Sequence, residues 1–103
     1  EIKNDLYDTQ YGLGAAYINK AADMFLKAND IMDVNKYTVA IEEANTVYAK
    51  ALPYMERALE LKPDDTYTLR SLQELYYRLK QKDASLNSKY EEVRAKLSAL
   101  EQK

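Results

Sequence analysis

Apolar residues recur along the chain every three or four positions, which is the spacing of one face of an α-helix. Over residues 4–32 this spacing predicts a long first helix. Its inward stripe is Leu6, Leu13, Tyr17, Ala21, Met24, Ala28 and Ile31, with Gln10 and Gly14 in phase. Glycine weakens a helix interior, so Gly12 and Gly14 predict that another backbone packs closely against the middle of this helix.

A second helix is predicted over residues 36–61, after a tight turn at residues 32–35 that is rich in Asp and Asn. Pro53 lies inside this segment, and proline removes a helical hydrogen bond. Either two helices meet at Pro53 or one helix kinks there. The stripe keeps its phase across Pro53, which favours one kinked helix. The inward residues are Ile41, Ala44, Val47, Tyr48, Ala51, Met55, Ala58 and Leu59.

A third helix is predicted over residues 66–81. Pro63 ends the second helix, and Asp64 or Asp65 is expected to cap the third. The inward residues are Leu69, Leu72, Leu75, Tyr76 and Leu79.

The fourth helix has two candidate starts. One follows a cap at Asp83, and the other is the capping-box spacing from Ser88 to Glu91. Leu86 is in phase with the later stripe, which favours the earlier start. That stripe continues through Tyr90, Val93, Leu97 and Leu100.

These elements predict one all-α domain, residues 1–103, of four helices in two antiparallel hairpins. The first hairpin is long (residues 4–61) and the second is short (residues 66–102).

The amino-acid composition excludes several classes of function. The chain lacks Cys and His and has only two glycines, so thiolate, imidazole and glycine-loop phosphate chemistry are excluded. With 15 basic and 17 acidic residues, its net charge of −2 argues against nucleic-acid binding. No apolar run reaches the roughly 18 residues that span a membrane, so we expect no membrane insertion. We expect that the chain is not an enzyme and that it binds no metal ion or cofactor. An enzyme that acts through Tyr and carboxylates alone is the rival interpretation, and it would need a buried cluster in which Tyr and Glu side chains converge.

The chain begins at Glu1 instead of Met and shows no signal-peptide pattern. We therefore expect a processed or excised piece of a longer protein. It is expected to be soluble, either cytoplasmic or in a periplasmic or secreted setting.

Two segments of the chain align with each other. Residues 11–17 match residues 70–76, so that Leu13 corresponds to Leu72 and Tyr17 to Tyr76. The matching leucines are 59 residues apart, which indicates an internal repeat of unusual length.

At these residues the chain resembles the tetratricopeptide repeat (TPR) family of helical hairpins. The family's Leu-Gly-x-x-Tyr pattern corresponds to residues 13–17, where small residues let two helices approach. Its second-helix pattern corresponds to Ala51, Met55, Ala58 and Pro63. The family period is about 34 residues, so the first hairpin is predicted to have longer helices. In the second repeat unit, Gln73 stands where the family has glycine, and Val93 and Leu100 stand where it has small alanines. The last unit therefore resembles a divergent terminal repeat.

The resemblance implies a fragment of an α-solenoid that acts as a non-catalytic protein-interaction or scaffolding module. Family ligands lie in a groove lined by the first helix of each repeat. Arg70, Tyr77 and Arg78 share one helix face and suit a peptide carboxylate or an acidic side chain. The family's chaperone-tail clamp uses Lys and Asn where this chain has Tyr11 and Ala15. The groove residues that the resemblance implies are Asp8, Tyr11, Ala15, Ile18, Asn19, Tyr67, Arg70, Glu74, Tyr77 and Arg78.

Two alternatives stay open. The third-helix face is alternatively a solvated surface with an intrahelical pair between Arg70 and Glu74. Alternatively the long hairpin serves structural self-association with an empty groove, because about two repeats fall short of the three that a solenoid usually needs. The expected partner is therefore a protein or peptide, or a second copy of the chain.

Overall fold

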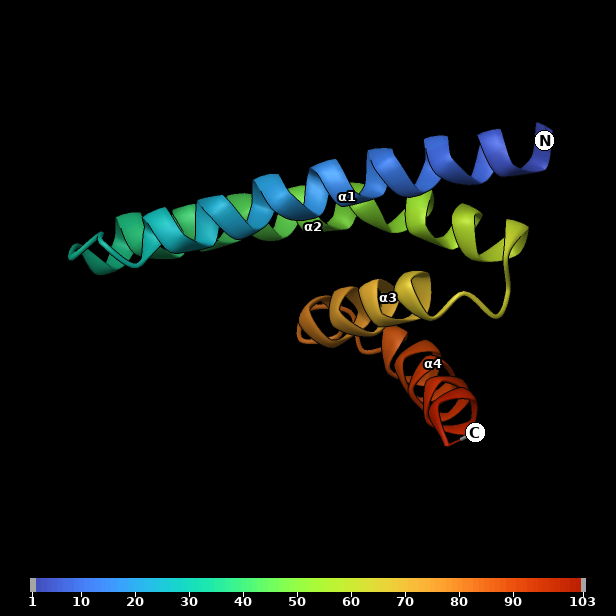
Figure 1. Cartoon of the computed structure of the whole chain (residues 1–103). Helices are drawn as coiled ribbons and strands as arrows, with labels where there is room; N and C mark the ends of the chain where they lie inside the picture. The colour runs from blue at the N-terminus through green and yellow to red at the C-terminus, as the bar shows by residue number, and fades with distance from the viewer. Residues whose placement is uncertain (1, 103) are drawn as a thin grey trace.

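The structure is a computed structural model that describes the backbone of residues 2–102 and the side chains of residues 6–102. It contains four α-helices joined by short turns (Figure 1). They are α1 (Ile2–Ala28), α2 (Val34–Leu61), α3 (Thr66–Leu79) and α4 (Leu86–Glu101). No strand occurs within residues 2–102, so the predicted all-α fold of four helices is confirmed.

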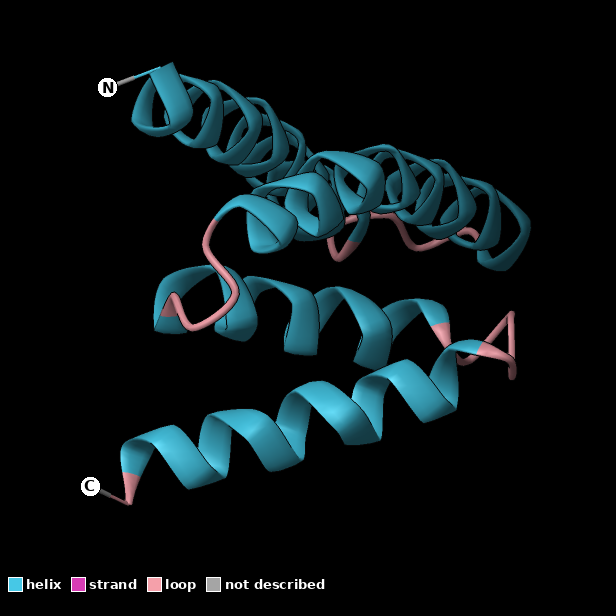
Figure 2. Ribbon diagram, turned by 90° about the vertical axis from the view of Figure 1, so that its right-hand side faces the viewer, coloured by secondary structure: helices cyan, strands magenta, loops and turns pink. Residues whose placement is uncertain are grey.

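The helices pair as two antiparallel hairpins, α1 with α2 and α3 with α4 (Figures 1 and 2). The long hairpin sets the greatest extent of the molecule, which measures 47 × 27 × 23 Å. Helix α3 packs under α2 and runs in the same direction as α1 (Figure 1). This arrangement confirms the predicted long and short hairpins.

Buried small residues recur at every seventh position on both helices of the long hairpin. Small side chains at this spacing let two helices approach closely along their length. On α1 a Cβ atom added at Gly14 would lie 2.9 Å from Met55 Cγ, so α2 does approach Gly14 closely, but the nearest atoms belong to a side chain and not to the backbone that was predicted. At Gly12 an added Cβ would meet nothing within 4 Å, so the prediction is wrong there. The buried series is Gly14, Ala21 and Ala28 on α1, and Ala44, Ala51 and Ala58 on α2.

The inward stripe predicted for the first part of α1 is wrong in phase. Leu6 and Leu13 are 43% and 42% exposed, whereas Tyr7 is buried. The prediction followed the largest aliphatic side chains. The close approach of α2 instead favours the face that carries the small residues, which lies one position further along the helix.

The helix boundaries follow the capping residues. Helix α2 begins after Asp33, whose side chain accepts a hydrogen bond from the backbone nitrogen of Lys36 at 3.0 Å, and it continues through Pro53 as one helix. Asp65 caps α3 by accepting from the Thr68 nitrogen at 2.8 Å, so of the two predicted caps it is the one used. Helix α4 starts at Leu86, so the earlier of its two predicted starts is the nearer one, but the predicted cap at Asp83 is wrong. The N-cap is Ser85, which makes no side-chain cap hydrogen bond, and Asp83 accepts from the Ser85 nitrogen at 3.1 Å within the preceding turn.

The core lies between the long hairpin and α3, and α4 closes its far side. Tyr48, Met55, Leu69, Leu72 and Leu75 are almost completely buried, as their stripes predicted. Helix α4 adds two predicted residues, Val93 and Leu97. Thr68 is the buried polar residue that the apolar stripes did not include.

The turn end of the long hairpin extends past α3 and α4 (Figure 1). Of the nine large hydrophobic residues that are strongly exposed among those described, five lie in residues 26–39, so the surface at this end is unusually apolar. They are Leu26, Met32, Val34, Tyr37 and Val39.

Candidate functional site

Three of the groove residues expected from the sequence line one hollow between α3 and α4. The hollow has a volume of about 480 Å³, and its lining includes Arg70, Glu74 and Tyr77 of α3. These positions share a helix face because they are spaced by three or four residues. Gln73 completes the α3 side, and Tyr90 of α4 forms the opposite wall. The centroids of the Tyr77 and Tyr90 rings are 5.8 Å apart, in a tilted arrangement.

Cations flank the aromatic pair. Arg70 forms an ion pair with Glu101 at the end of α4, and both side chains are well exposed. The Lys80 ammonium lies 4.5 Å from the centroid of the Tyr90 ring and 5.4 Å from that of Tyr77. The lining of the hollow therefore combines two aromatic rings with the Arg70 guanidinium and the Glu74 carboxylate, and a guanidinium beside aromatic rings can bind a carboxylate and an apolar side chain together.

The ion pairs differ from the intrahelical pair that the sequence suggested. Arg70 bonds to α4 across the short hairpin, and Glu74 instead accepts a hydrogen bond from Arg78 at 3.0 Å. Both pairs are at the surface, where each contributes little to stability.

Arg78 lies on a different side of α3 from Arg70. Its guanidinium carbon is 4.8 Å from the centroid of the Tyr48 ring and 5.2 Å from that of Phe25. A hollow of about 290 Å³ beside it is lined by residues of α1, α2 and the end of α3, and Tyr77 also borders it. Arg78 thus packs α3 against the long hairpin, and it does not line the α3–α4 hollow.

The remaining groove candidates are spread over the molecule. Tyr11 and Ile18 are half-buried against the core, and Ala15 packs there as well. Asn19 and Tyr67 are exposed, Tyr67 by 67%. Asp8 is exposed on α1. None of these six residues lines any of the four main hollows formed by the described residues.

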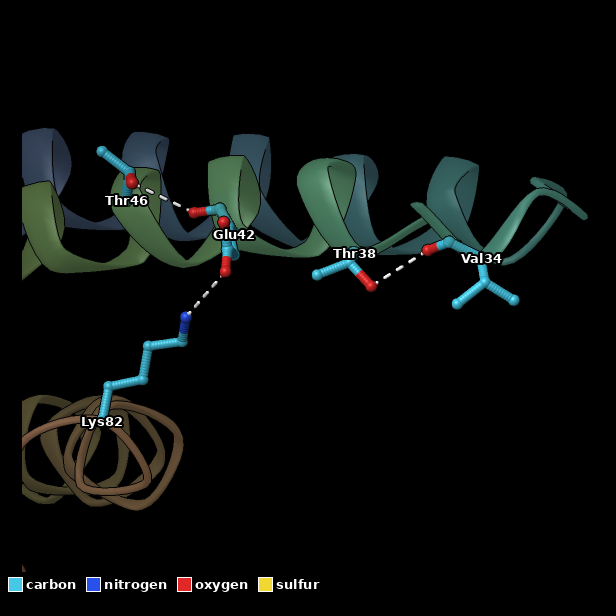
Figure 3. A network of polar contacts seen from close by, with 5 residues as sticks. All are labelled: Val34, Thr38, Glu42, Thr46 and Lys82. Atoms are coloured by element: carbon cyan, nitrogen blue, oxygen red, sulfur yellow. Dashed lines mark hydrogen bonds and ion pairs between the residues drawn. The ribbon is translucent and has the colours of Figure 1, made fainter. Parts of the chain in front are cut away.

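The largest of these four hollows, about 550 Å³, was not anticipated from the sequence. It lies between α2 and the turn that joins α3 to α4, over Leu52, Leu79 and Leu86. The Lys82 side chain spans the gap and its ammonium lies 3.4 Å from a carboxylate oxygen of Glu42, as Figure 3 shows. Leu52 is a large apolar residue of α2 outside the predicted inward stripe, and this position was the feature of the sequence that could have indicated the hollow.

A polar cluster joins the start of α1 to the start of α3. The Tyr7 hydroxyl donates to Asp65 at 2.7 Å and lies 2.8 Å from the Thr68 hydroxyl. The Lys62 ammonium sits 4.4 Å from the centroid of the Tyr7 ring. Burial raises the pKa of Tyr7 to about 12. Burial also tends to raise the pKa of Asp65, but hydrogen bonds from Tyr7 and Thr68 and the charge of Lys62 outweigh it and hold that pKa below its usual value.

A second polar contact joins α2 and α3. The Tyr76 hydroxyl donates to Glu56 at 2.5 Å, and Lys89 of α4 lies 3.6 Å from the same carboxylate. Burial, and then the hydrogen bond to Glu56, raise the pKa of Tyr76 well above its ordinary value. A tyrosine held neutral in this way serves as a structural donor, because its proton is hard to remove near neutral pH.

Within the described part of the chain, no group of three or more acidic residues is placed to hold a metal ion. Among the same residues, no helix combines the length and the apolar character needed to cross a membrane. Comparison of the chain with family models, curated proteins and solved structures gave no match.

Proposed function

We propose that the chain is a non-catalytic, TPR-like protein-interaction module that binds an acidic segment of a partner protein in the α3–α4 hollow. The observation that carries this proposal is the shared lining of one hollow by Arg70, Tyr77 and Tyr90. An acidic side chain or a carboxyl terminus would bind Arg70, while a neighbouring apolar side chain would pack on the two rings.

The ion pair between Arg70 and Glu101 supports this assignment. It places a carboxylate of the chain itself on the guanidinium at the edge of the hollow. A carboxylate of a partner would take the same position after Glu101 is displaced. Since both side chains are exposed, this displacement has a small cost.

The likeness to TPR hairpins is supported by the long hairpin itself. A Cβ added at Gly14 would lie only 2.9 Å from Met55 Cγ, and Ala51 and Ala58 are completely buried, in keeping with the family's small positions, which allow close helix packing. Leu13 departs from the pattern because it is 42% exposed.

The proposal is tested by selecting peptides from a random displayed library on the purified chain and measuring their affinity by calorimetry. We expect acidic sequences to be enriched. Their affinity should fall at least about tenfold for Arg70→Ala/Tyr77→Ala, because a charge-assisted hydrogen bond and an aromatic contact are lost. Arg94→Ala is the matched control, since it removes an exposed arginine of α4 whose ion pair among the described side chains is with Glu91 of its own helix.

Glu101→Gln provides the opposite change. It frees Arg70 from its internal partner, so acidic peptides should bind severalfold more tightly than to the wild type. Selected peptides without acidic residues, or equal affinity for the wild type and Arg70→Ala/Tyr77→Ala, would contradict the proposal.

Structural self-association is a second candidate function. It is favoured by the apolar turn end of the long hairpin, which α3 and α4 leave uncovered.

A further inference from the structure

We infer that a second copy of this chain docks on the start of α2 as an antiparallel, two-fold helix pair. The docking face, here called the tip surface, is a hollow of about 410 Å³ near the turn end of the long hairpin. The inference deepens the self-association alternative and is independent of peptide binding in the α3–α4 hollow. The tip surface is lined by Ile31, Asn35, Lys36, Val39, Ala40 and Glu43.

The tip surface faces away from the short hairpin. Along α2, Val34, Thr38, Glu42 and Thr46 form a row, and Glu42 points towards Lys82 on the α3 side (Figure 3). Successive helical residues are turned by about 100°. The line through residues 36, 39 and 43 therefore lies on another side of α2, and Val39 is 54% exposed there.

The order of residues on the tip surface is self-complementary. Lys36 and Glu43 carry opposite charges and lie seven residues apart, with Val39 and Ala40 between them. If a second copy packs antiparallel with the two-fold axis between positions 39 and 40, each Lys36 meets Glu43 of the other copy. The small Ala40 and the medium-sized Val39 at the crossing point allow close helix packing.

The charges of the tip surface have no partner within the described side chains. The ion pairs formed among residues 6–102 include neither the Lys36 ammonium nor the Glu43 carboxylate. A two-fold pair supplies both partners at once, and it covers apolar surface between them.

The charge near the turn favours a second copy over a lipid surface. Residues 27–43 contain four acidic side chains and two basic ones, and an anionic membrane repels such a segment. The acidic residues are Asp30, Asp33, Glu42 and Glu43, and the basic ones are Lys27 and Lys36.

Sedimentation equilibrium of the 103-residue chain from micromolar to millimolar concentration tests the inference. We expect the wild type to dimerise. Lys36→Glu or Glu43→Lys should each weaken the dimer about tenfold, since each reversal turns two attractive contacts into repulsive ones. Lys36→Glu/Glu43→Lys restores both attractions and should return to within about threefold of the wild type. Lys20→Glu, which reverses an exposed charge on α1, should have no effect.

Val39→Glu separates loss of docking from loss of folding. Glutamate is a better helix former than valine, so this variant should keep its helical circular dichroism while its dimer dissociates. A wild type that stays monomeric at millimolar concentration would overturn the inference, as would charge reversals that leave the dimer unchanged or are not rescued by the double variant. Acidic peptides should bind the single variants and the wild type equally, so failure here is distinguishable from failure of the peptide-binding proposal.

Discussion

Gly12 and Gly14 lie two residues apart on α1, but their surroundings differ. The space around Gly12 is open, whereas a Cβ at Gly14 would lie 2.9 Å from Cγ and 3.0 Å from Cε of Met55. Met55 is fully buried, so its side chain has little room to move away. The same substitution therefore has opposite effects at the two sites.

Gly12→Ala should raise the free energy of unfolding by about 0.5–1 kcal/mol, the helix-propensity gain at an unobstructed position. Gly14→Ala should lower it by about 1–3 kcal/mol, because overpacking exceeds the same gain. Urea unfolding of both variants measures the contrast. Equal stabilisation by both would mean that α2 is not packed closely against Gly14.

The ionised carboxylate of Asp65 makes the stability of the fold depend on pH. Its pKa in the folded chain is lowered from 3.8, so its contribution is present near neutral pH and is lost as the pH falls below about 4. Asp65→Asn keeps a side chain that can cap α3 but removes the charge. We expect this variant to be about 1–2 kcal/mol less stable than the wild type at neutral pH. The difference should shrink as the pH falls below about 4.

Asp64→Asn is the matched control for Asp65→Asn. Asp64 is exposed, and its carboxylate lies 3.4 Å from the Lys96 ammonium in a surface pair, so its removal should change stability by less than about 1 kcal/mol. Thermal unfolding across the acidic range compares the three proteins. A stability difference for Asp65→Asn that does not vary with pH would contradict the role of the charge.

At the scale of elements, proline acts differently in α2 and in the following turn. Pro53 lies inside a continuous helix, where it cannot donate to the carbonyl of Ala49. Pro63 lies in the turn after the last residue of α2, where a fixed backbone angle is compatible with the chain path. The two residues thus provide an internal comparison of proline inside and outside a helix.

Pro53→Ala should stabilise the fold by about 1–3 kcal/mol, because it restores a helical hydrogen bond. Pro63→Ala should destabilise it by up to about 1 kcal/mol, because the unfolded chain gains freedom. Denaturant unfolding measures both changes, with circular dichroism as a check on helix content. A loss of stability in Pro53→Ala would show that the packing of α2 requires the proline.

Most elements could be predicted from the sequence because local signals agree with one another. The Asp-rich turns set the starts of α2 and α3, and the phase of the stripe across Pro53 identified α2 as one helix. The first part of α1 could not be predicted as well. Its exposed face carries Leu6 and Leu13, while its buried face carries small residues and Tyr7, so side-chain size alone indicated the wrong side.

At the scale of the whole molecule, the candidate site was predicted only in part. Arg70, Glu74 and Tyr77 lie in one hollow because helical spacing alone puts them on one face of α3. The opposite wall depends on how α4 packs on α3, which brings Tyr90 and Glu101 to this face. Such contacts between helices follow from tertiary packing, and no local spacing in the sequence encodes them.

Binding of an acidic segment in the proposed α3–α4 hollow can be mapped residue by residue. The most direct measurement is the change in backbone amide chemical shifts when the isotopically labelled chain is titrated with the tightest-binding peptide from the displayed library. We expect the largest changes on residues around the hollow, including Arg70, Tyr77, Tyr90 and Glu101. Changes confined to the hollow over Leu52 and Leu86, or to the tip surface, would contradict it.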